Sequence, residues 1–153
     1  MPDYPCHRDQ FPSWVSVPVR WGDMDAMGHV NNAMYMTYLE SARIHLFAEL
    51  GMAQPMDAAH IGFALVSVTC NFRQQVRFPA TLEIGTALRS VGNRSFHLVH
   101  GLFFEETGNL AADASSVVAW VDYNRGQAIP LSGAVRTLLE ARLAPKENQA
   151  PQP

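Results

Sequence analysis

The chain has 153 residues, of which 48% are hydrophobic and 16% are charged, and its formal net charge is −3 at pH 7. A chain of this length is expected to form a single domain with a sizeable core. The charge gives no electrostatic reason to expect a nucleic acid or an anionic membrane as partner. No run of about 18 apolar residues predicts a membrane span, and the N-terminus lacks the apolar segment of a secretory signal. Cys6 and Cys70 lie far apart without metal-site spacing, so we expect neither structural zinc nor a disulfide framework. We therefore expect the protein in the reducing cytoplasm.

The N-terminal third predicts a poorly ordered lead-in over residues 1–12, then a strand, then a long helix. Residues 13–21 alternate between apolar and polar side chains, which indicates a strand, and Pro18 favours a sheet edge. The stretch NAMYMTYLESARIHLFAELG carries apolar residues at helical spacing. Asn31 or Asn32 is the expected N-cap, and Gly51 stands where a helix-ending glycine belongs. Since most sides of this helix are apolar, we expect other structure to wrap around it.

The remainder of the chain predicts strands and one short helix. Segments rich in β-branched and aromatic residues are separated by turn signals such as Gly92-Asn93. The expected strands cover 63–73, 81–91, 95–105 and 111–123. Ser132 is expected to cap a short amphipathic helix, and residues 145–153 predict a disordered tail. The sequence therefore predicts an α+β domain over 13–144, with an antiparallel five-stranded sheet curled around one long helix and a short C-terminal helix.

The segment RWGDMDAMGHVNN joins the first strand to the long helix and is unusually polar. Aspartate, asparagine and glycine are turn formers, so the segment is first of all a connecting loop. Its aspartate pair also matches the start of a calcium loop, but Met27 and Met34 stand where two oxygen ligands are required, so calcium is rejected. A site for another divalent ion, made from Asp23, Asp25 and His29, stays open, although we expect no metal and no cofactor.

A catalytic interpretation rests on where the helix begins. A helix N-terminus has unpaired backbone N–H groups and a partial positive charge, so it can stabilise an oxyanion formed from a carbonyl group. A carboxylate close by can act as general base or as nucleophile. Asp25 lies seven residues before Asn32, and Gly28 lets the chain turn between them. The segment thus supplies an attacking group and an oxyanion site together.

These residues resemble a known family. The run DMDAMGHVNN, followed by Tyr35 and the run ESAR, is similar to the signature of the 4-hydroxybenzoyl-CoA thioesterase group of hotdog-fold acyl-CoA thioesterases. The similarity extends from about Val17 to Leu131 and includes FRQQVRFPATLEIGTAL and VGNRSFHL. It implies a hotdog fold, an acyl-CoA or acyl-carrier-protein thioester as substrate, and a homodimer or homotetramer with sites at subunit interfaces.

The resemblance also implies roles for single residues. Asp25 matches the catalytic aspartate, and the backbone N–H near Asn32 matches the group that polarises the thioester carbonyl. His29 either holds the loop through hydrogen bonds or takes part in catalysis directly, and both readings stay open. The implied substrate-binding residues are Gly28, Asn31, Tyr35, Arg94 and Ser95.

The leading hypothesis is hydrolysis of a fatty-acyl or aryl thioester to a free acid and CoA. Two alternatives stay open: a non-catalytic acyl-thioester-binding protein of the same fold, and a hydratase or dehydratase. The hydratase pattern places four residues between aspartate and histidine, whereas three lie between Asp25 and His29 and five between Asp23 and His29. This spacing speaks against a hydratase. The acyl group and the carrier, CoA or acyl carrier protein, are not readable from the sequence.

Overall fold

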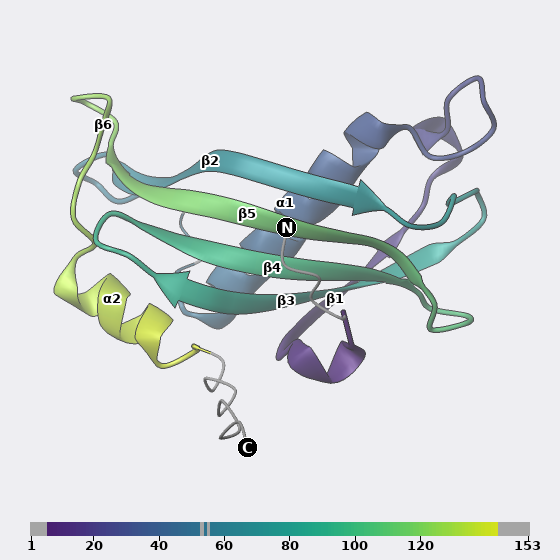
Figure 1. Cartoon of the computed structure of the whole chain (residues 1–153). Coiled ribbons are helices and arrows are strands. Elements are labelled where there is room, and N and C mark those ends of the chain that lie inside the picture. Colours follow the sequence, from purple (N-terminus) through teal and green to yellow (C-terminus); the bar gives the residue numbers. More distant parts are fainter. Residues whose placement is uncertain (1–5, 53, 55, 144–153) are drawn as a thin grey trace, which may run out of the picture.

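The computed structural model describes residues 6–52, 54 and 56–143, and it has a curled antiparallel sheet with one long helix packed across one face (Figure 1). The elements in chain order are η1 (Arg8–Gln10), β1 (Ser13–Pro18), η2 (Trp21–Asp23), α1 (Asn32–Glu49), β2 (Ile61–Phe72), β3 (Thr81–Val91), β4 (Ser95–Phe104), β5 (Leu110–Asp122), β6 (Gln127–Ala128) and α2 (Gly133–Glu140). The five long strands and both α-helices confirm the α+β prediction.

The strand order in the sheet is β1-β3-β4-β5-β2, and every neighbouring pair is antiparallel. The last three long strands form a meander, as their short connections indicate, while β2 crosses to the far edge beside β5. A two-residue strand, β6, pairs with β5 and was not expected from the sequence. Both β1 and β2 are therefore edge strands, and the ending of β1 at Pro18 fits the preference of proline for such positions.

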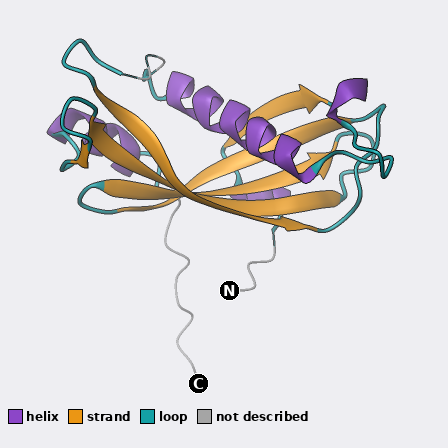
Figure 2. Ribbon diagram, turned by 90° about the horizontal axis from the view of Figure 1, so that it is seen from above, coloured by secondary structure: helices purple, strands orange, loops and turns teal. Residues whose placement is uncertain are grey.

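Local sequence fixes both ends of α1. The Asn31 side chain accepts a hydrogen bond of 2.9 Å from the backbone N–H of Ala33, which is an N-cap, and Gly51 follows the helix with a φ of +76°. The buried face carries Tyr35, Tyr38, Leu39, Ala42, Arg43, Leu46 and Phe47. The expectation of a helix wrapped on most sides is wrong for the single chain. Ile44 is 51% exposed, and no described element covers the outer side of α1 (Figure 2).

A buried polar network crosses the middle of the interface between α1 and the sheet. The His100 ring lies between the hydroxyls of Thr86 (3.0 Å) and Ser116 (2.9 Å), and the Arg43 guanidinium donates to the Ser116 hydroxyl at 3.4 Å. Burial, together with the charge of Arg43, lowers the pKa of His100 to about 3. The ring is thus a neutral structural residue at ordinary pH. Arg43 faces inward to Ser116, and burial lowers the pKa of its guanidinium, which the nearby charge of Glu40 partly offsets.

The described residues before β1 pack against the sheet. Residues 6–12 were expected to be poorly ordered, but they include the 3-10 helix η1, and Phe11 is only 6% exposed. The Phe11 ring packs on the sheet face away from α1, against Gly85 and Gly101, where a Cβ atom at either glycine would lie less than 3 Å from it. Glycines at these two positions leave the space that the ring fills.

Two further differences concern the ends of elements. The expected first strand reaches residue 21, whereas β1 ends at Pro18 and Trp21 begins η2 with 74% of its surface exposed. At the C-terminal side, Ser132 caps α2 as predicted, accepting the Val135 N–H at 3.3 Å, and Leu139 is fully buried. The expected tail 145–153 lies outside the described residues. Within the described ranges, no helix combines the length and the apolar character that crossing a membrane requires.

Candidate active site

The loop between η2 and α1 is closed by backbone hydrogen bonds. The N–H of Asp25 donates to the carbonyl of His29 at 3.0 Å, and the N–H of Asn31 donates to the carbonyl of Asp23 at 3.0 Å. Gly28 closes the turn by donating to the Asp25 carbonyl at 3.0 Å, with a φ of +82° that favours glycine. These bonds hold Asp25 in a fixed loop at the N-terminal end of α1.

Asp23 anchors this loop from inside the protein. Its carboxylate is 3% exposed and accepts hydrogen bonds from the Tyr38 hydroxyl (2.6 Å), the Arg20 backbone N–H (2.9 Å) and the Arg20 guanidinium (3.2 Å). Burial alone raises the pKa of this carboxyl, but the hydrogen bonds and the Arg20 charge outweigh burial and hold the pKa below its usual range. Asp23 is therefore an ionised structural residue.

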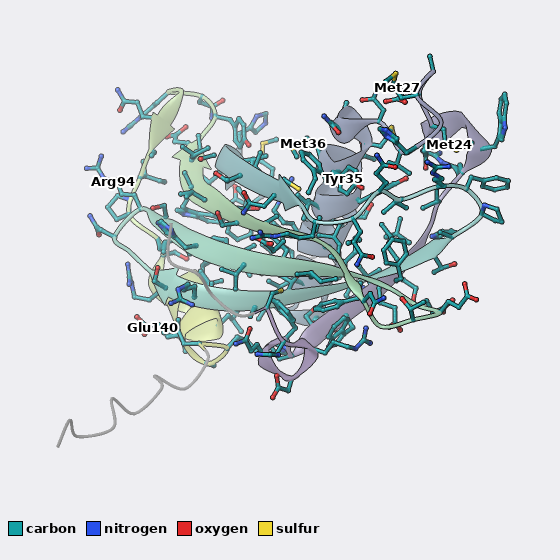
Figure 3. The ribbon with its side chains drawn as sticks, turned by 45° about the vertical axis from the view of Figure 1, so that its right-hand side comes forward. Met24, Met27, Tyr35, Met36, Arg94 and Glu140 are labelled. Carbon is teal, nitrogen blue, oxygen red and sulfur yellow. The ribbon has the colours of Figure 1, made fainter. Side chains whose placement is uncertain are left out.

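Asp25 is in a different environment. Its side chain is partly exposed, and one oxygen accepts the Met27 N–H at 2.9 Å, while the other has no hydrogen-bond partner among the described residues. Asn32 is the first residue of α1, and no described acceptor takes its backbone N–H. Figure 3 shows Met24 and Met27 on the same loop, beside the end of α1 that carries Tyr35. A carboxylate oxygen and a helix N-terminus are both available here.

Three other predicted site residues have structural roles in the loop or at the start of α1. His29 is partly buried, and it holds the loop through its backbone carbonyl, since its ring has no hydrogen bond to another described residue. Tyr35 is 3% exposed and packs edge-on against Phe72, with the ring centroids 4.8 Å apart. Burial raises the pKa of Tyr35 to about 12, so this phenol stays protonated at ordinary pH. Asn31 acts as the N-cap of α1.

Arg94 and Ser95 lie at the other end of the molecule. They follow the β3–β4 turn, and Figure 3 shows Arg94 on the side opposite to Met27. The Arg94 side chain is exposed, and its guanidinium has no partner among the residues that the structure describes. The structure therefore does not bring Arg94 next to Asp25 within one chain. Arg73, another candidate cation, is paired with Asp113.

The arrangement does not favour a metal site. The Asp23 oxygens are used by Arg20 and Tyr38, and no group of three or more metal-ligating side chains lies together in the described ranges. Two hollows in the described part, of about 390 Å³ and about 290 Å³, are both lined by residues outside the Asp25 loop. A single chain thus presents the Asp25 loop at its surface and not inside either hollow.

Sequence reasoning missed three contacts that position this loop. Tyr38 reaches the Asp23 carboxylate, Phe72 covers Tyr35, and the carbonyl of Val76 accepts the N–H of Val30 at 2.8 Å. The helical spacing indicated that Tyr38 is buried, which is a signal that its hydroxyl needs a partner. The other two contacts join distant segments, and no local pattern indicates them.

Comparison with known proteins gives a consistent result. A family model described as the thioesterase-like superfamily matches residues 19–139. A long-chain acyl-CoA thioesterase, FadM, from Escherichia coli (strain K12) is 31% identical over 126 residues, which cover 82% of this chain and 96% of the relative. These matches confirm the resemblance seen in the sequence.

Solved structures of thioesterases match the fold as well. A gentisyl-coenzyme A thioesterase is 26% identical, with a TM-score of 0.75, over 83% of this chain and 99% of its own. A thioesterase from Thermus thermophilus, solved with coenzyme A and Zn, is 27% identical with a TM-score of 0.73 and coverages of 87% and 95%. The hotdog architecture is thereby confirmed.

Proposed function

Because this chain belongs to the thioesterase-like superfamily and is a thioester hydrolase, we propose that it hydrolyses acyl-CoA thioesters with Asp25 as its catalytic carboxylate. The proposal rests on two groups of one loop that backbone hydrogen bonds close: the partly exposed carboxylate of Asp25, and the available N–H of Asn32 where α1 begins. The acyl group is a fatty-acyl or an aryl group, and the carrier is CoA.

The proposed reaction follows from the two groups. The Asn32 N–H donates a hydrogen bond to the thioester carbonyl oxygen, and together with the positive end of α1 it stabilises the negative charge that develops on that oxygen during attack. Asp25 takes a proton from a water molecule, the water oxygen bonds to the carbonyl carbon, and the C–S bond breaks. The sulfur leaves as thiolate and is protonated, so the products are a carboxylic acid and free CoA.

The same groups support a second form of this step, in which Asp25 attacks the carbonyl itself. An anhydride then forms between Asp25 and the acyl group, and water hydrolyses it. A single turnover in ¹⁸O-water tests for the second form. With Asp25 as base, ¹⁸O appears in the free acid alone, so ¹⁸O in the Asp25 carboxylate would show an anhydride that water attacks at its Asp25 carbonyl.

We propose a homodimer that joins the β2 edges of two copies. The outer edge of β2 has no neighbouring strand among the described elements, and its Leu65 and Val66 are 47% and 63% exposed. An open, apolar edge of this length favours pairing with a second copy. In a two-fold dimer the partner subunit's Arg94 can then reach the Asp25 site, where it would contact the CoA phosphates.

Replacement of the carboxylate tests the catalytic assignment. We expect Asp25→Asn to lower kcat by about a hundredfold or more on acyl-CoA substrates, because a general base or nucleophile is lost. Asp122→Asn is a matched control, since Asp122 also accepts a backbone N–H within a surface turn, from Asn124 at 2.9 Å. The measurement is release of free CoA, detected with a thiol reagent. A wild-type protein that binds acyl-CoA but releases no CoA would favour the non-catalytic binder instead.

Arg94→Ala tests the phosphate contact. We expect a higher KM for acyl-CoA with little change in kcat, because a charge that holds the distant nucleotide contributes equally to substrate and transition state. Acyl-pantetheine, which has no phosphate, should show no such increase. An equal increase of KM for both substrates would contradict a phosphate-binding role.

A further inference from the structure

The short turn between β3 and β4 is held by a side chain of the C-terminal helix. The Nη2 atom of Arg136, on α2, donates hydrogen bonds to the carbonyl of Gly92 at 2.8 Å and to the carbonyl of Asn93 at 3.3 Å. Its Nη1 atom donates to the Glu140 carboxylate at 3.4 Å, which fixes the orientation of the guanidinium. Figure 3 shows Arg94, the last residue of the turn, on the same side of the molecule as Glu140.

The other carbonyls of this turn are bonded to the protein as well. The N–H of Leu131 donates to the Asn93 carbonyl at 2.9 Å, and the N–H of Trp120 donates to the Arg94 carbonyl at 2.9 Å. Each carbonyl from Gly92 to Arg94 therefore accepts a hydrogen bond from outside the turn, although all three residues are exposed. Exposed turns are ordinarily among the more mobile parts of a domain, so bonding of this extent makes the turn unusually rigid.

The bonded carbonyls determine where the N–H groups of the turn point. In a planar trans peptide, the C=O of one residue and the N–H of the next point in opposite directions. The carbonyls of Gly92 and Asn93 point to Arg136, so the N–H groups of Asn93 and Arg94 point away from α2, and no described residue accepts either of them. The exposed Arg94 side chain extends from the same place. Consecutive available N–H groups beside a cation suit an anion such as a phosphate.

The helix that carries Arg136 is itself firmly anchored. Ser132 caps its N-terminus, Leu139 is fully buried, and Val135 packs against the cluster of core side chains that contains Leu139. These contacts fix the position of α2, and they leave Arg136 on the side that faces the turn. The helix is thus a rigid support for the β3–β4 turn.

We propose that Arg136 is a positioning residue for substrate recognition: it holds the β3–β4 turn so that Arg94 and the two available N–H groups receive the phosphates of CoA. Arg136 does not touch the phosphates and acts through the turn. The helix α2 then contributes to the choice of CoA as carrier. This inference rests on the proposed contact between Arg94 and the CoA phosphates.

Binding of adenosine 3′,5′-bisphosphate, which is the phosphate-bearing end of CoA without the thioester, tests the inference by calorimetry. Arg136→Met keeps the apolar stem and removes every donor, and we expect it to raise the Kd about fivefold, as for residues coupled in one hydrogen-bond network. Arg136→Lys keeps a donor and the charge, so it should bind almost as tightly as the wild type. Arg142→Met is the matched control. It removes a charge from the same end of the chain, where Arg142 pairs with Glu49 at 3.9 Å, and it should leave the Kd unchanged.

Combination with Arg94→Ala separates a positioning role from a direct contact. Independent effects of about fivefold each would multiply to about 25-fold, whereas a residue that acts through the turn should add clearly less once the Arg94 side chain is gone. Arg136→Met should also raise KM for acyl-CoA with little change in kcat, and it should leave KM for acyl-pantetheine unchanged. A role in stability alone would not distinguish these two substrates. Arg136→Gln, which keeps one side-chain donor group, is the second variant if Arg136→Met does not fold, and a smaller increase of Kd is expected for it.

The outcomes separate this inference from the proposed function. An Arg136→Met protein that binds the bisphosphate like the wild type, while Arg94→Ala binds it more weakly, would overturn the inference and leave the phosphate contact intact. Fully multiplicative effects, or an equal loss in Arg142→Met, would overturn it as well, because the charge of Arg136 would then act directly. A wild type that hydrolyses acyl-CoA without binding the bisphosphate would overturn both roles at the turn and leave Asp25 unaffected. Absence of acyl-CoA hydrolysis with intact bisphosphate binding would overturn the proposed reaction alone.

Discussion

The hydrogen bond from Tyr38 to Asp23 is expected to be one of the main supports of the catalytic loop. Tyr38→Phe removes the hydroxyl that donates to the Asp23 carboxylate at 2.6 Å, and leaves a carboxylate that is only 3% exposed with one donor fewer. A hydrogen bond to a charged group contributes about 1.5–3 kcal/mol, so we expect the free energy of unfolding to fall by about 2 kcal/mol. For a domain of this size that corresponds to a Tm lowered by roughly 4–8 °C.

The pH dependence of this effect has a definite sign. The Asp23 carboxyl has a lowered pKa in the folded protein, so its contribution to stability is present above the unfolded pKa of about 3.9 and is lost as the pH falls through the folded pKa. The difference between wild type and Tyr38→Phe should thus be largest near pH 7 and shrink below about pH 4. Urea unfolding at both pH values measures it.

Tyr35→Phe is the matched control. It removes a tyrosine hydroxyl from the same face of α1, but that hydroxyl has no hydrogen bond to another described residue. The control should cost clearly less than Tyr38→Phe. Equal losses in the two variants, or a Tyr38→Phe effect that does not change between pH 7 and pH 3, would refute the assignment of Asp23 as an ionised anchor.

Three further changes are expected to affect stability. Asn31→Ala removes the N-cap of α1 and should cost about 1 kcal/mol in urea unfolding. Gly85→Ala places a Cβ 2.6 Å from Phe11 and should cost about 1–3 kcal/mol, less when combined with Phe11→Ala. The lowered pKa of His100 means that the unfolded chain takes up a proton below about pH 6.5 while the folded protein does not, so stability should fall between pH 7 and pH 4. His100→Asn should reduce that slope in urea titrations; an unchanged slope would contradict a neutral buried ring.

The fold was largely predictable because its elements are regular over long stretches. The third long strand was expected at 81–91, where β3 lies, and the caps at Asn31 and Ser132 were expected from residue type. The first strand was drawn too long because the alternation of side chains continues to Trp21. The backbone in fact turns after Pro18, since the Asp23 carboxylate accepts the Arg20 N–H and winds the chain into η2. The alternation of apolar and polar side chains does not show that a side chain such as Asp23 will take up a backbone N–H and end the strand.

The candidate site, like the fold, was only partly predictable from the sequence. Asp25, Gly28 and Asn32 belong to one short segment, so their joint position at the helix start could be anticipated from sequence alone. Outside this loop, the hollow of about 290 Å³ is built from four segments that are far apart along the chain, and none of them carries a polar motif. Its existence depends on how β2, β5 and α2 meet, which only the tertiary structure gives. The same holds for Arg43, whose burial beside Ser116 depends on strand neighbours.

The aromatic ring of Phe11 has a consequence for how far this folding unit extends. The family match begins at residue 19, but Phe11 fills the gap in front of two glycines on neighbouring strands, Gly85 and Gly101. A version trimmed to the matched residues would lose the whole of β1 as well as the Phe11 ring that lies against these glycines. The family match and the packed structure of this chain therefore begin at different residues.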